Sequence, residues 1–92
     1  MKKLTDEHIA ERLTARENWT LQDGAICRTF EFGDFLGAMH FVNGVAEAAQ
    51  AADHHPDIDI RYSKVTLRLS THDANGLTER DFALAATVDA LI

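Results

Sequence analysis

The chain has 92 residues and a formal net charge of −6, with 15 acidic against 9 lysine and arginine side chains. This length predicts one domain with a small core, which a second copy of the chain could help to bury. The acidic balance argues against a nucleic-acid partner, because phosphate binding depends on lysine and arginine. No apolar run approaches the roughly 20 residues of a membrane span. The polar first residues are unlike a signal peptide, and one cysteine, Cys27, fits a reducing compartment. We therefore expect a cytoplasmic protein.

The first half of the chain predicts a helix, a hairpin and a second helix. Residues 5–16 begin with a capping threonine and two acids, and their apolar residues share a helical face. Two strands follow, around 19–21 and over 25–32. The Asp23-Gly24 pair between them favours a type I′ hairpin turn, in which both central residues have positive φ. Residues 35–52 then have helical spacing.

The second half predicts a further hairpin and a last helix. Pro56 ends the second helix, because proline disfavours the helical conformation of the residue before it. The alternation over 58–62 and 65–69 changes phase between the two runs, which predicts a tight turn or a bulge. The order is thus α-β-β-α-β-β-α, with the last helix over 78–91. It predicts an α+β, two-layer fold for the single domain 1–92: a four-stranded antiparallel sheet with three helices on one face.

Some helix faces can be predicted as well. One face of the second helix is marked by residues at helical spacing: Phe35, Met39, Val42, Val45, Ala46 and Ala49. In the last helix the residues expected to face inward are Phe82, Ala85, Val88 and Leu91 or Ile92. Gly37 and Gly44 lie seven residues apart in the second helix. Because glycine costs about 1 kcal/mol relative to alanine inside a helix, we expect another backbone, from the sheet or from a second subunit, to approach closely there.

Three of the five histidines, His54, His55 and His72, fall in the run from residue 54 to residue 81. Each lies beside a break in the hydrophobic pattern, where a scaffold presents side chains. Histidine changes charge near neutral pH without perturbation, at a pKa of about 6.5, so these side chains are candidates for acid–base chemistry. Taken one at a time, each also has an ordinary interpretation as a solvated loop residue.

Other interpretations of the same run remain open. The Thr78-x-x-Asp81 spacing is that of a helix capping box, a simpler role for Asp81 that is compatible with orienting a histidine. Three histidines and a carboxylate also suit zinc or iron. The spacing lacks His-x-His and His-Glu-x-x-His, so a metal-dependent hydrolase is the weaker hypothesis. Trp19 and Tyr62 could stack on a flat ligand, although such aromatics are more often core residues.

Several residues of this region recur in a known pattern at fixed spacing. The pattern consists of Asp53-His54-His55-Pro56, Tyr62-x-x-Val65, Leu69-Ser70-Thr71-His72 and Gly76-Leu77-Thr78-x-x-Asp81. Trp19 and the Phe30-x-Phe32-x-Asp34-Phe35 stretch extend it over nearly the whole chain. With this pattern the chain resembles the pterin-4a-carbinolamine dehydratase family. It departs from that family at Gln50, where relatives often carry glutamate, and at Ile58 and Ile60, where some relatives have larger residues.

The resemblance implies a hydro-lyase, 4a-hydroxytetrahydrobiopterin dehydratase. Such an enzyme converts 4a-hydroxytetrahydropterin to quinonoid dihydropterin and water, recycling the pterin cofactor of aromatic amino-acid hydroxylases. The family works without a metal or a cofactor of its own. By the match, His54 and His72 would be the catalytic acid and base. The resemblance does not assign which of the two donates the proton and which accepts it. His55, Asp81 and Trp19 would contribute to substrate binding, with Asp81 supporting a histidine.

The resemblance also implies a homodimer or a homotetramer, and an aromatic amino-acid hydroxylase is a candidate partner. An alternative function is a non-catalytic dimerisation or assembly factor of the same fold. Members with that role can dispense with the pocket histidines, whereas this chain has all three. The glycine-bearing face of the second helix would be the docking surface for such a partner.

Overall fold

Helices and strands alternate in the order that the sequence predicts. The computed structural model describes residues 2–92. The elements are α1 (Asp6–Thr14), β1 (Thr20–Gln22), β2 (Ala25–Glu31), α2 (Phe35–Ala52), β3 (Asp57–Arg61), β4 (Lys64–Leu69), the short 3₁₀ helix η1 (His72–Ala74) and α3 (Glu79–Asp89). The bounds predicted for α2 are those observed. No helix in residues 2–92 is long and apolar enough to cross a membrane.

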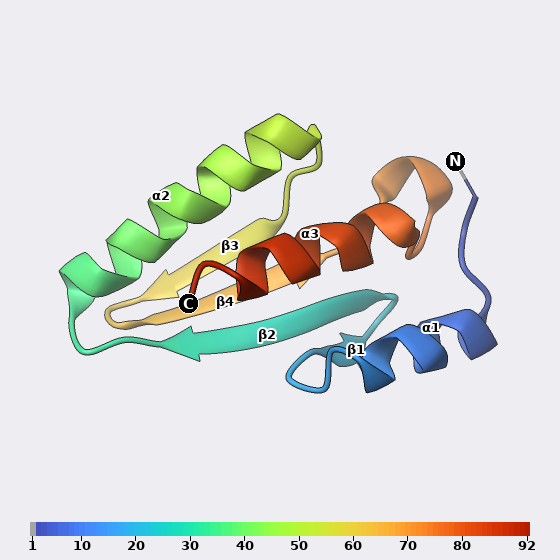
Figure 1. Ribbon diagram of the computed structural model, residues 1–92, viewed down its shortest axis with the longest axis horizontal. Coiled ribbons are helices and arrows are strands. Elements are labelled where there is room, and N and C mark those ends of the chain that lie inside the picture. Colours follow the sequence, from blue (N-terminus) through green and yellow to red (C-terminus); the bar gives the residue numbers. More distant parts are fainter. Residues whose placement is uncertain (1) are drawn as a thin grey trace.

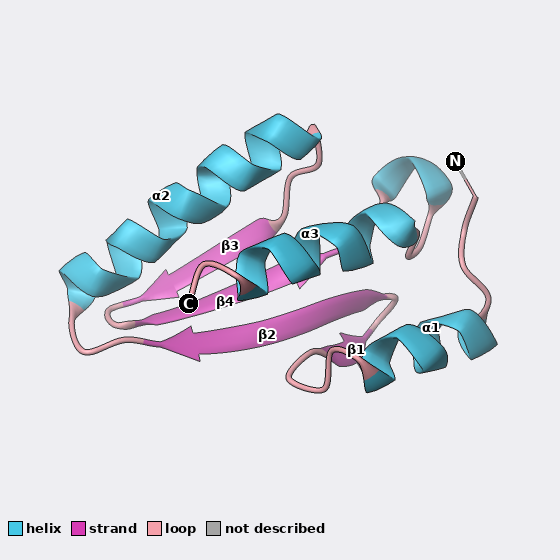
Figure 2. Cartoon of the chain, viewed as in Figure 1, coloured by secondary structure: helices cyan, strands magenta, loops and turns pink. Residues whose placement is uncertain are grey.

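The four strands form one antiparallel sheet in the order β1-β2-β4-β3, and the helices lie on one face of it (Figures 1 and 2). The predicted α+β two-layer fold is therefore confirmed. Ile26 and Phe30 of β2 lie opposite Leu69 and Val65 of β4, and all four side chains are buried beneath the helices. The other face of the sheet carries the polar alternate residues.

Both hairpins turn through residues in the left-handed region. Asp23 and Gly24 have φ of 47° and 78°, which confirms the type I′ turn between β1 and β2. The phase change between β3 and β4 is a tight turn in which Tyr62 has φ of 55°. At the end of α2, Asp53 has φ of 50° and turns the chain abruptly out of the helix. This turn sets the direction in which the next two residues leave α2.

The predicted inward faces of the helices are partly wrong. In α2 the buried side chains are Ala38, Phe41, Val45 and Ala49. Phe35 is 46% exposed, and the C-terminal Leu91 and Ile92 are 45% and 61% exposed. Because α2 is rich in alanine and other apolar residues around most of its circumference, periodicity alone cannot decide which side meets the sheet.

Within the described chain, the two helix glycines do not mark the close approach of another backbone. A Cβ added at Gly44 would meet a side-chain carbon of Leu91 at 3.4 Å, and one added at Gly37 would meet the Asp34 carboxylate at 3.1 Å. That carboxylate caps α2 by accepting a hydrogen bond from the Gly37 N–H. The close neighbours are thus a side chain and a helix cap. A bulky residue at Gly44 would push against Leu91 of its own chain.

One ion-pair cluster ties the N-terminal third of the chain to α3. Asp89 accepts hydrogen bonds from Trp19 Nε1 at 3.0 Å, from Arg28 at 2.7 Å and from Arg16 at 3.1 Å. Arg28 lies in phase with the buried residues of β2, and its guanidinium also stacks over the Phe30 ring at 4.4 Å. The cluster explains how a charged residue is accommodated on the helix-facing side of the sheet.

Candidate active site

A polar pocket lies where the α2–β3 connection, the end of β4 and the start of α3 meet. Its accessible volume is about 220 Å³. The side chains that line it come from three separate stretches of sequence: Asp53, His54, His55, Ser70, Thr71, His72, Asp73 and Arg80. All three predicted histidines are therefore brought together, from segments that the antiparallel topology places at one end of the sheet (Figure 1).

The three histidines differ in their exposure. His54 is 8% exposed, whereas His55 and His72 are exposed. His72 follows the end of β4 and begins η1, the strand-terminus position that the sequence predicts. His54 and His55 follow the left-handed turn at Asp53. One histidine is thus anchored in the protein, and two are presented to solvent.

His54 is anchored by Asp81. Its Nε2 lies 2.6 Å from Asp81 Oδ1, and Asp81 is fully buried at 0% exposure. The other carboxylate oxygen, Oδ2, accepts hydrogen bonds from the Thr71 hydroxyl at 2.8 Å and from the Thr78 N–H at 2.9 Å. The capping box predicted for Thr78 and Asp81 is confirmed. Asp81 therefore both caps α3 and holds the imidazole, so the two interpretations are compatible.

This pairing decides which ring nitrogen of His54 faces the pocket. When Asp81 is ionised its carboxylate only accepts hydrogen bonds, and Nε2 of His54 is then the donor. In residues 2–92, every buried side-chain nitrogen or oxygen has a hydrogen-bond partner. Nδ1 of His54 has no partner within the described chain, so this atom is the one that reaches the pocket. A neutral His54 then offers a bare nitrogen there, which can accept a proton.

His55 has a neutral partner. Its Nε2 lies 3.2 Å from Oε1 of Gln50, on the last turns of α2. The amide oxygen can only accept, so this ring nitrogen donates. Gln50, noted as a departure from the family pattern, thus fixes the ring that stands at the rim of the pocket.

Comparison with known proteins identifies the family of the chain. The family described as "Pterin 4 alpha carbinolamine dehydratase" matches residues 2–91. A protein of Acidobacterium capsulatum is 59% identical over 92 residues, with all of both chains covered. One of Picosynechococcus sp. is 52% identical over 89 residues, with 97% of both chains covered. Both carry the provisional name pterin-4-alpha-carbinolamine dehydratase. The chain belongs to the pterin-4-alpha-carbinolamine dehydratase family. It is thus a dehydratase, and its class is that of the hydro-lyases.

Solved structures agree with the family. The crystal structure of a transcriptional coactivator/pterin dehydratase from Brucella melitensis matches with a TM-score of 0.94 and 37% identity, covering 98% of each chain. A pterin dehydratase-like protein that is a RuBisCO assembly factor in the alpha-carboxysome has a TM-score of 0.66 and 24% identity, covering 79% of this chain and 84% of its own. The second likeness shows the fold alone.

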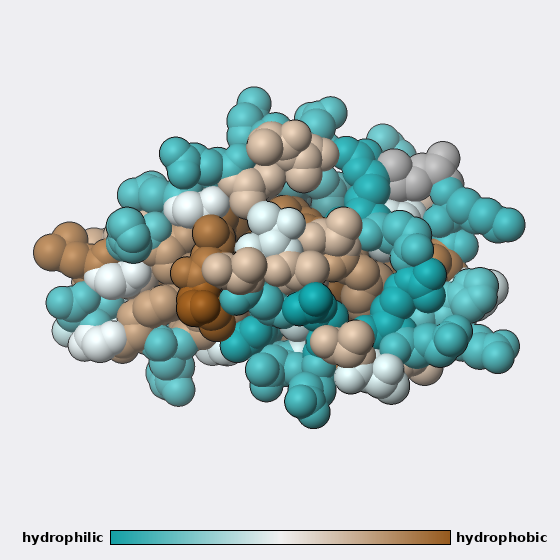
Figure 3. Space-filling view, viewed as in Figure 1, coloured by the Kyte–Doolittle hydropathy of each residue, from teal (hydrophilic) through white to brown (hydrophobic). Residues whose placement is uncertain are grey.

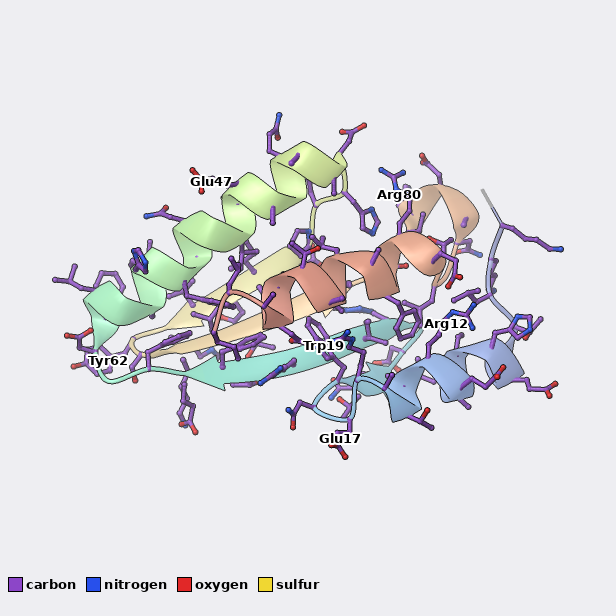
Figure 4. All side chains as sticks on the ribbon, in the orientation of Figure 1. Arg12, Glu17, Trp19, Glu47, Tyr62 and Arg80 are labelled. Carbon is purple, nitrogen blue, oxygen red and sulfur yellow. The ribbon has the colours of Figure 1, made fainter. Side chains whose placement is uncertain are left out.

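The pocket of this dehydratase contains residues that the sequence analysis did not single out. Arg80 donates to the backbone oxygens of Ala52 at 3.0 Å and Asp53 at 2.6 Å, and so fastens the start of α3 to the end of α2 (Figure 4). Thr71 contacts Asp81 directly. A signal for Thr71 was present, because it continues the buried phase of Val65, Leu67 and Leu69 in β4. No local pattern marks Arg80, since its partners are carbonyl groups distant in sequence.

The structure does not bring Trp19 to the pocket of the dehydratase. Trp19 is 2% exposed and lies beneath α3 in the core, where its Nε1 donates to Asp89 (Figure 4). Tyr62 lies in the β3–β4 turn, at the end of the molecule opposite Arg80, and is 70% exposed. Neither aromatic ring lines the histidine pocket. Within residues 2–92, no group of three or more His, Cys, Asp or Glu side chains has the arrangement of a metal site.

Proposed function

We propose that the protein dehydrates 4a-hydroxytetrahydropterin to quinonoid dihydropterin by histidine acid–base catalysis. The observation that carries the proposal is the union of His54, His55 and His72 in one pocket, with His54 held by the buried Asp81. Imidazoles suit this chemistry because they exchange protons near neutral pH.

The reaction needs one base and one acid. The base removes the proton from N5, and the electron pair of that N–H bond forms the double bond between N5 and C4a. The C4a–O bond breaks as the hydroxyl takes a proton from the acid and leaves as water. His54, through Nδ1, and His72 are the proposed pair. General acid–base catalysis of this kind contributes about 10²–10⁴-fold in rate.

The remaining side chains bind and orient. In the proposal His55, fixed by Gln50, contacts the pterin, and Asp81 keeps His54 in one orientation and one tautomer. Trp19, far from the pocket lining, has a structural role through Asp89. In this proposal the reaction requires neither a metal nor a second cofactor.

The test measures the rate of 4a-hydroxytetrahydropterin dehydration by absorbance. The dehydration rate with the wild-type protein is expected to be clearly higher than the rate in buffer alone. His72→Ala should lower the rate by two orders of magnitude or more, which corresponds to about 2.7 kcal/mol in the activation barrier. His40→Ala is the matched control, because His40 is an exposed histidine of α2 that does not line the pocket. A wild type no faster than buffer would contradict the proposal.

We also propose a setting for the reaction. The quinonoid product is an oxidised pterin that a reductase can return to the tetrahydro form, so the enzyme would recycle the cofactor of an aromatic amino-acid hydroxylase, with tetrahydrobiopterin as the expected pterin. The free thiol of Cys27 suits a reducing compartment, which supports a cytoplasmic location.

A homo-oligomer is the proposed assembly, and β3 supports it. This strand lies at one edge of the sheet and pairs only with β4 in the described chain. Its Ile58 and Ile60 point to the helix-covered side yet remain 38% and 37% exposed. Exposed edges with apolar side chains favour pairing with another strand. The apolar surface in Figure 3 gathers near the C-terminal end and where α2 begins.

Sedimentation velocity tests this assembly. Ile60→Lys at the β3 edge should shift the protein toward the monomer. Gln22→Lys at the other edge strand, β1, should keep the oligomeric state of the wild type. A wild type that sediments as a monomer would contradict the proposal.

A second candidate function is a dimerisation or assembly cofactor. The observation that favours it is the Brucella melitensis relative, whose structure is described as both transcriptional coactivator and pterin dehydratase. The pocket histidines are not needed for such a role. If His72→Ala abolishes dehydration and leaves partner binding intact, both functions coexist in one chain.

A further inference from the structure

The hydrogen bonds behind His54 have a single possible direction. The Thr71 hydroxyl donates its proton to Asp81 Oδ2, so the 2.8 Å contact between the Thr71 and Thr78 hydroxyls can only be a bond from Thr78 to Thr71. The Thr78 hydroxyl oxygen in turn accepts from the Arg80 N–H at 3.3 Å. The chain of donors therefore runs from Thr78 through Thr71 to Asp81, and the proton on His54 Nε2 meets the same carboxylate from the other side.

All members of this chain are buried. Thr71 is 4% exposed, Thr78 1% and Asp81 0%. A buried carboxylate is costly unless donors surround it, and polar networks of this kind fix geometry when every member is satisfied. Three donors reach the two oxygens of Asp81: the Thr71 hydroxyl, the Thr78 N–H and His54 Nε2. The Thr78 N–H belongs to the helix cap and His54 is the group that is held, so the Thr71 hydroxyl is the remaining donor to Asp81, and it comes from outside α3.

Thr71 also precedes His72. Its backbone is held separately, because its N–H and carbonyl exchange hydrogen bonds with Gly76 at 2.9 and 3.4 Å. The side chain of Thr71 thus links the buried His54–Asp81 pair to the segment that carries the exposed His72. Removing the hydroxyl would leave the backbone bonds intact and free the carboxylate to turn.

We propose that Thr71 is a positioning residue of the dehydratase: its hydroxyl, oriented by Thr78, holds Asp81 so that the His54 proton stays on Nε2 and bare Nδ1 faces the pocket. The catalytic consequence rests on the proposed function. The tautomer does not, because it is a property of the resting protein.

Thr71→Val keeps the branched shape and removes the hydroxyl, whereas Thr71→Ser keeps the hydroxyl. Thr66→Val is the matched control. Thr66 lies on β4 and loses an equivalent threonine–threonine contact, to Thr29 at 2.9 Å, on the face of the sheet away from the pocket. Backbone spectra of each variant establish that it is folded.

The first readout is ¹⁵N NMR of the His54 ring, which distinguishes a protonated from a bare nitrogen. In the wild type, Thr71→Ser and Thr66→Val we expect Nε2 to carry the proton, and in Thr71→Val we expect a mixture of tautomers. The second readout is kinetic: kcat of Thr71→Val should fall about tenfold or more, as for a misplaced catalytic group, while KM stays within about twofold. Thr71→Ser should restore kcat.

Two results would overturn the proposal: a wild type with its His54 proton on Nδ1, or a Thr71→Val variant with the tautomer and kcat of the wild type. The first needs no variant, so the test stands even if Thr71→Val fails to fold. A wild type without dehydratase activity would defeat the proposed function, and the NMR result would still decide whether Thr71 sets the tautomer.

Discussion

At the scale of single residues, the pocket uses three histidines in three environments. His54 is buried against a carboxylate 27 residues away, His55 is held at the rim by an amide, and His72 stands exposed at the end of a strand. Identical side chains therefore have different surroundings, set by what each contacts. The buried ring of His54 cannot move without disturbing Asp81.

His55→Ala should separate binding from chemistry. Because His55 is proposed to contact the pterin without transferring a proton, its loss should raise KM several-fold and leave kcat within about threefold. Steady-state kinetics on the variant give both numbers, with the exposed α1 histidine replaced in His8→Ala as the control. A fall in kcat to the level of His72→Ala would show that His55 takes part in the proton transfers.

Cys27 offers a test of burial on the outer side of the sheet. Burial raises the pKa of the Cys27 thiol above its ordinary value. Since the thiolate is the reactive form, a raised pKa leaves less of it at pH 8. Iodoacetamide should therefore label Cys27 more slowly in the folded protein than in urea, with the difference shrinking as pH rises. Equal rates in the two states at pH 8 would contradict the shift.

At the scale of elements, the start of α3 organises the site. Its first turns supply Asp81 to the His54 ring and Arg80 to the carbonyl groups at the end of α2. Two adjacent residues thus have two roles: Asp81 caps α3, and Arg80 binds the end of α2. The pocket takes its shape from this junction, because the α2–β3 connection carries His54 and His55.

Arg80→Met should loosen that junction. The variant keeps much of the apolar stem and loses the bonds to Ala52 and Asp53, which at a partly exposed site costs about 1 kcal/mol in the free energy of unfolding. Urea titration measures the change. Arg61→Met is the control: the ion pair of Arg61 with Asp59 of its own strand is largely exposed, and its loss should cost within about 0.5 kcal/mol. Equal losses in the two variants would contradict the role of Arg80.

Several elements could be predicted from sequence because their signals are local. The Asp23-Gly24 turn, the cap at Thr5 and the capping box of Thr78 and Asp81 all lie within four residues. The inward side of α2 could not be fully predicted, because its apolar residues surround the helix and only packing in the fold, such as that of Phe41 against Phe30, selects the buried side. The site histidines stood out by residue type and by resemblance, whereas their partners depend on contacts across the fold.

At the scale of the whole molecule, Asp89 holds the N-terminal third against the rest. Trp19, Arg16 and Arg28 converge on this carboxylate from segments 61 to 73 residues away. The resemblance had suggested Trp19 as a substrate contact. Its actual partner lies 70 residues further along the chain, a distance that no sequence spacing encodes.

Asp89→Ala should destabilise the fold and leave the pocket chemistry intact in the folded fraction. The variant leaves the Nε1–H of Trp19 and the partly buried guanidinium of Arg28 without their acceptor. Losing one partner of such a group lowers the free energy of unfolding by about 2–4 kcal/mol. Urea unfolding followed by Trp19 fluorescence measures it, with the exposed Asp59→Ala as control. A loss below 1 kcal/mol would mean that the cluster contributes little.

The central claim is that His54 and His72 act together on one dehydration step. The measurement that tests it most directly is a double-mutant cycle: the dehydration rates of the wild type, His54→Gln, His72→Ala and the double variant. Each single variant should lose about 100-fold or more, and the double should be little slower than the slower single, because groups that act as a unit are not additive. Single variants that keep the wild-type rate would contradict the account.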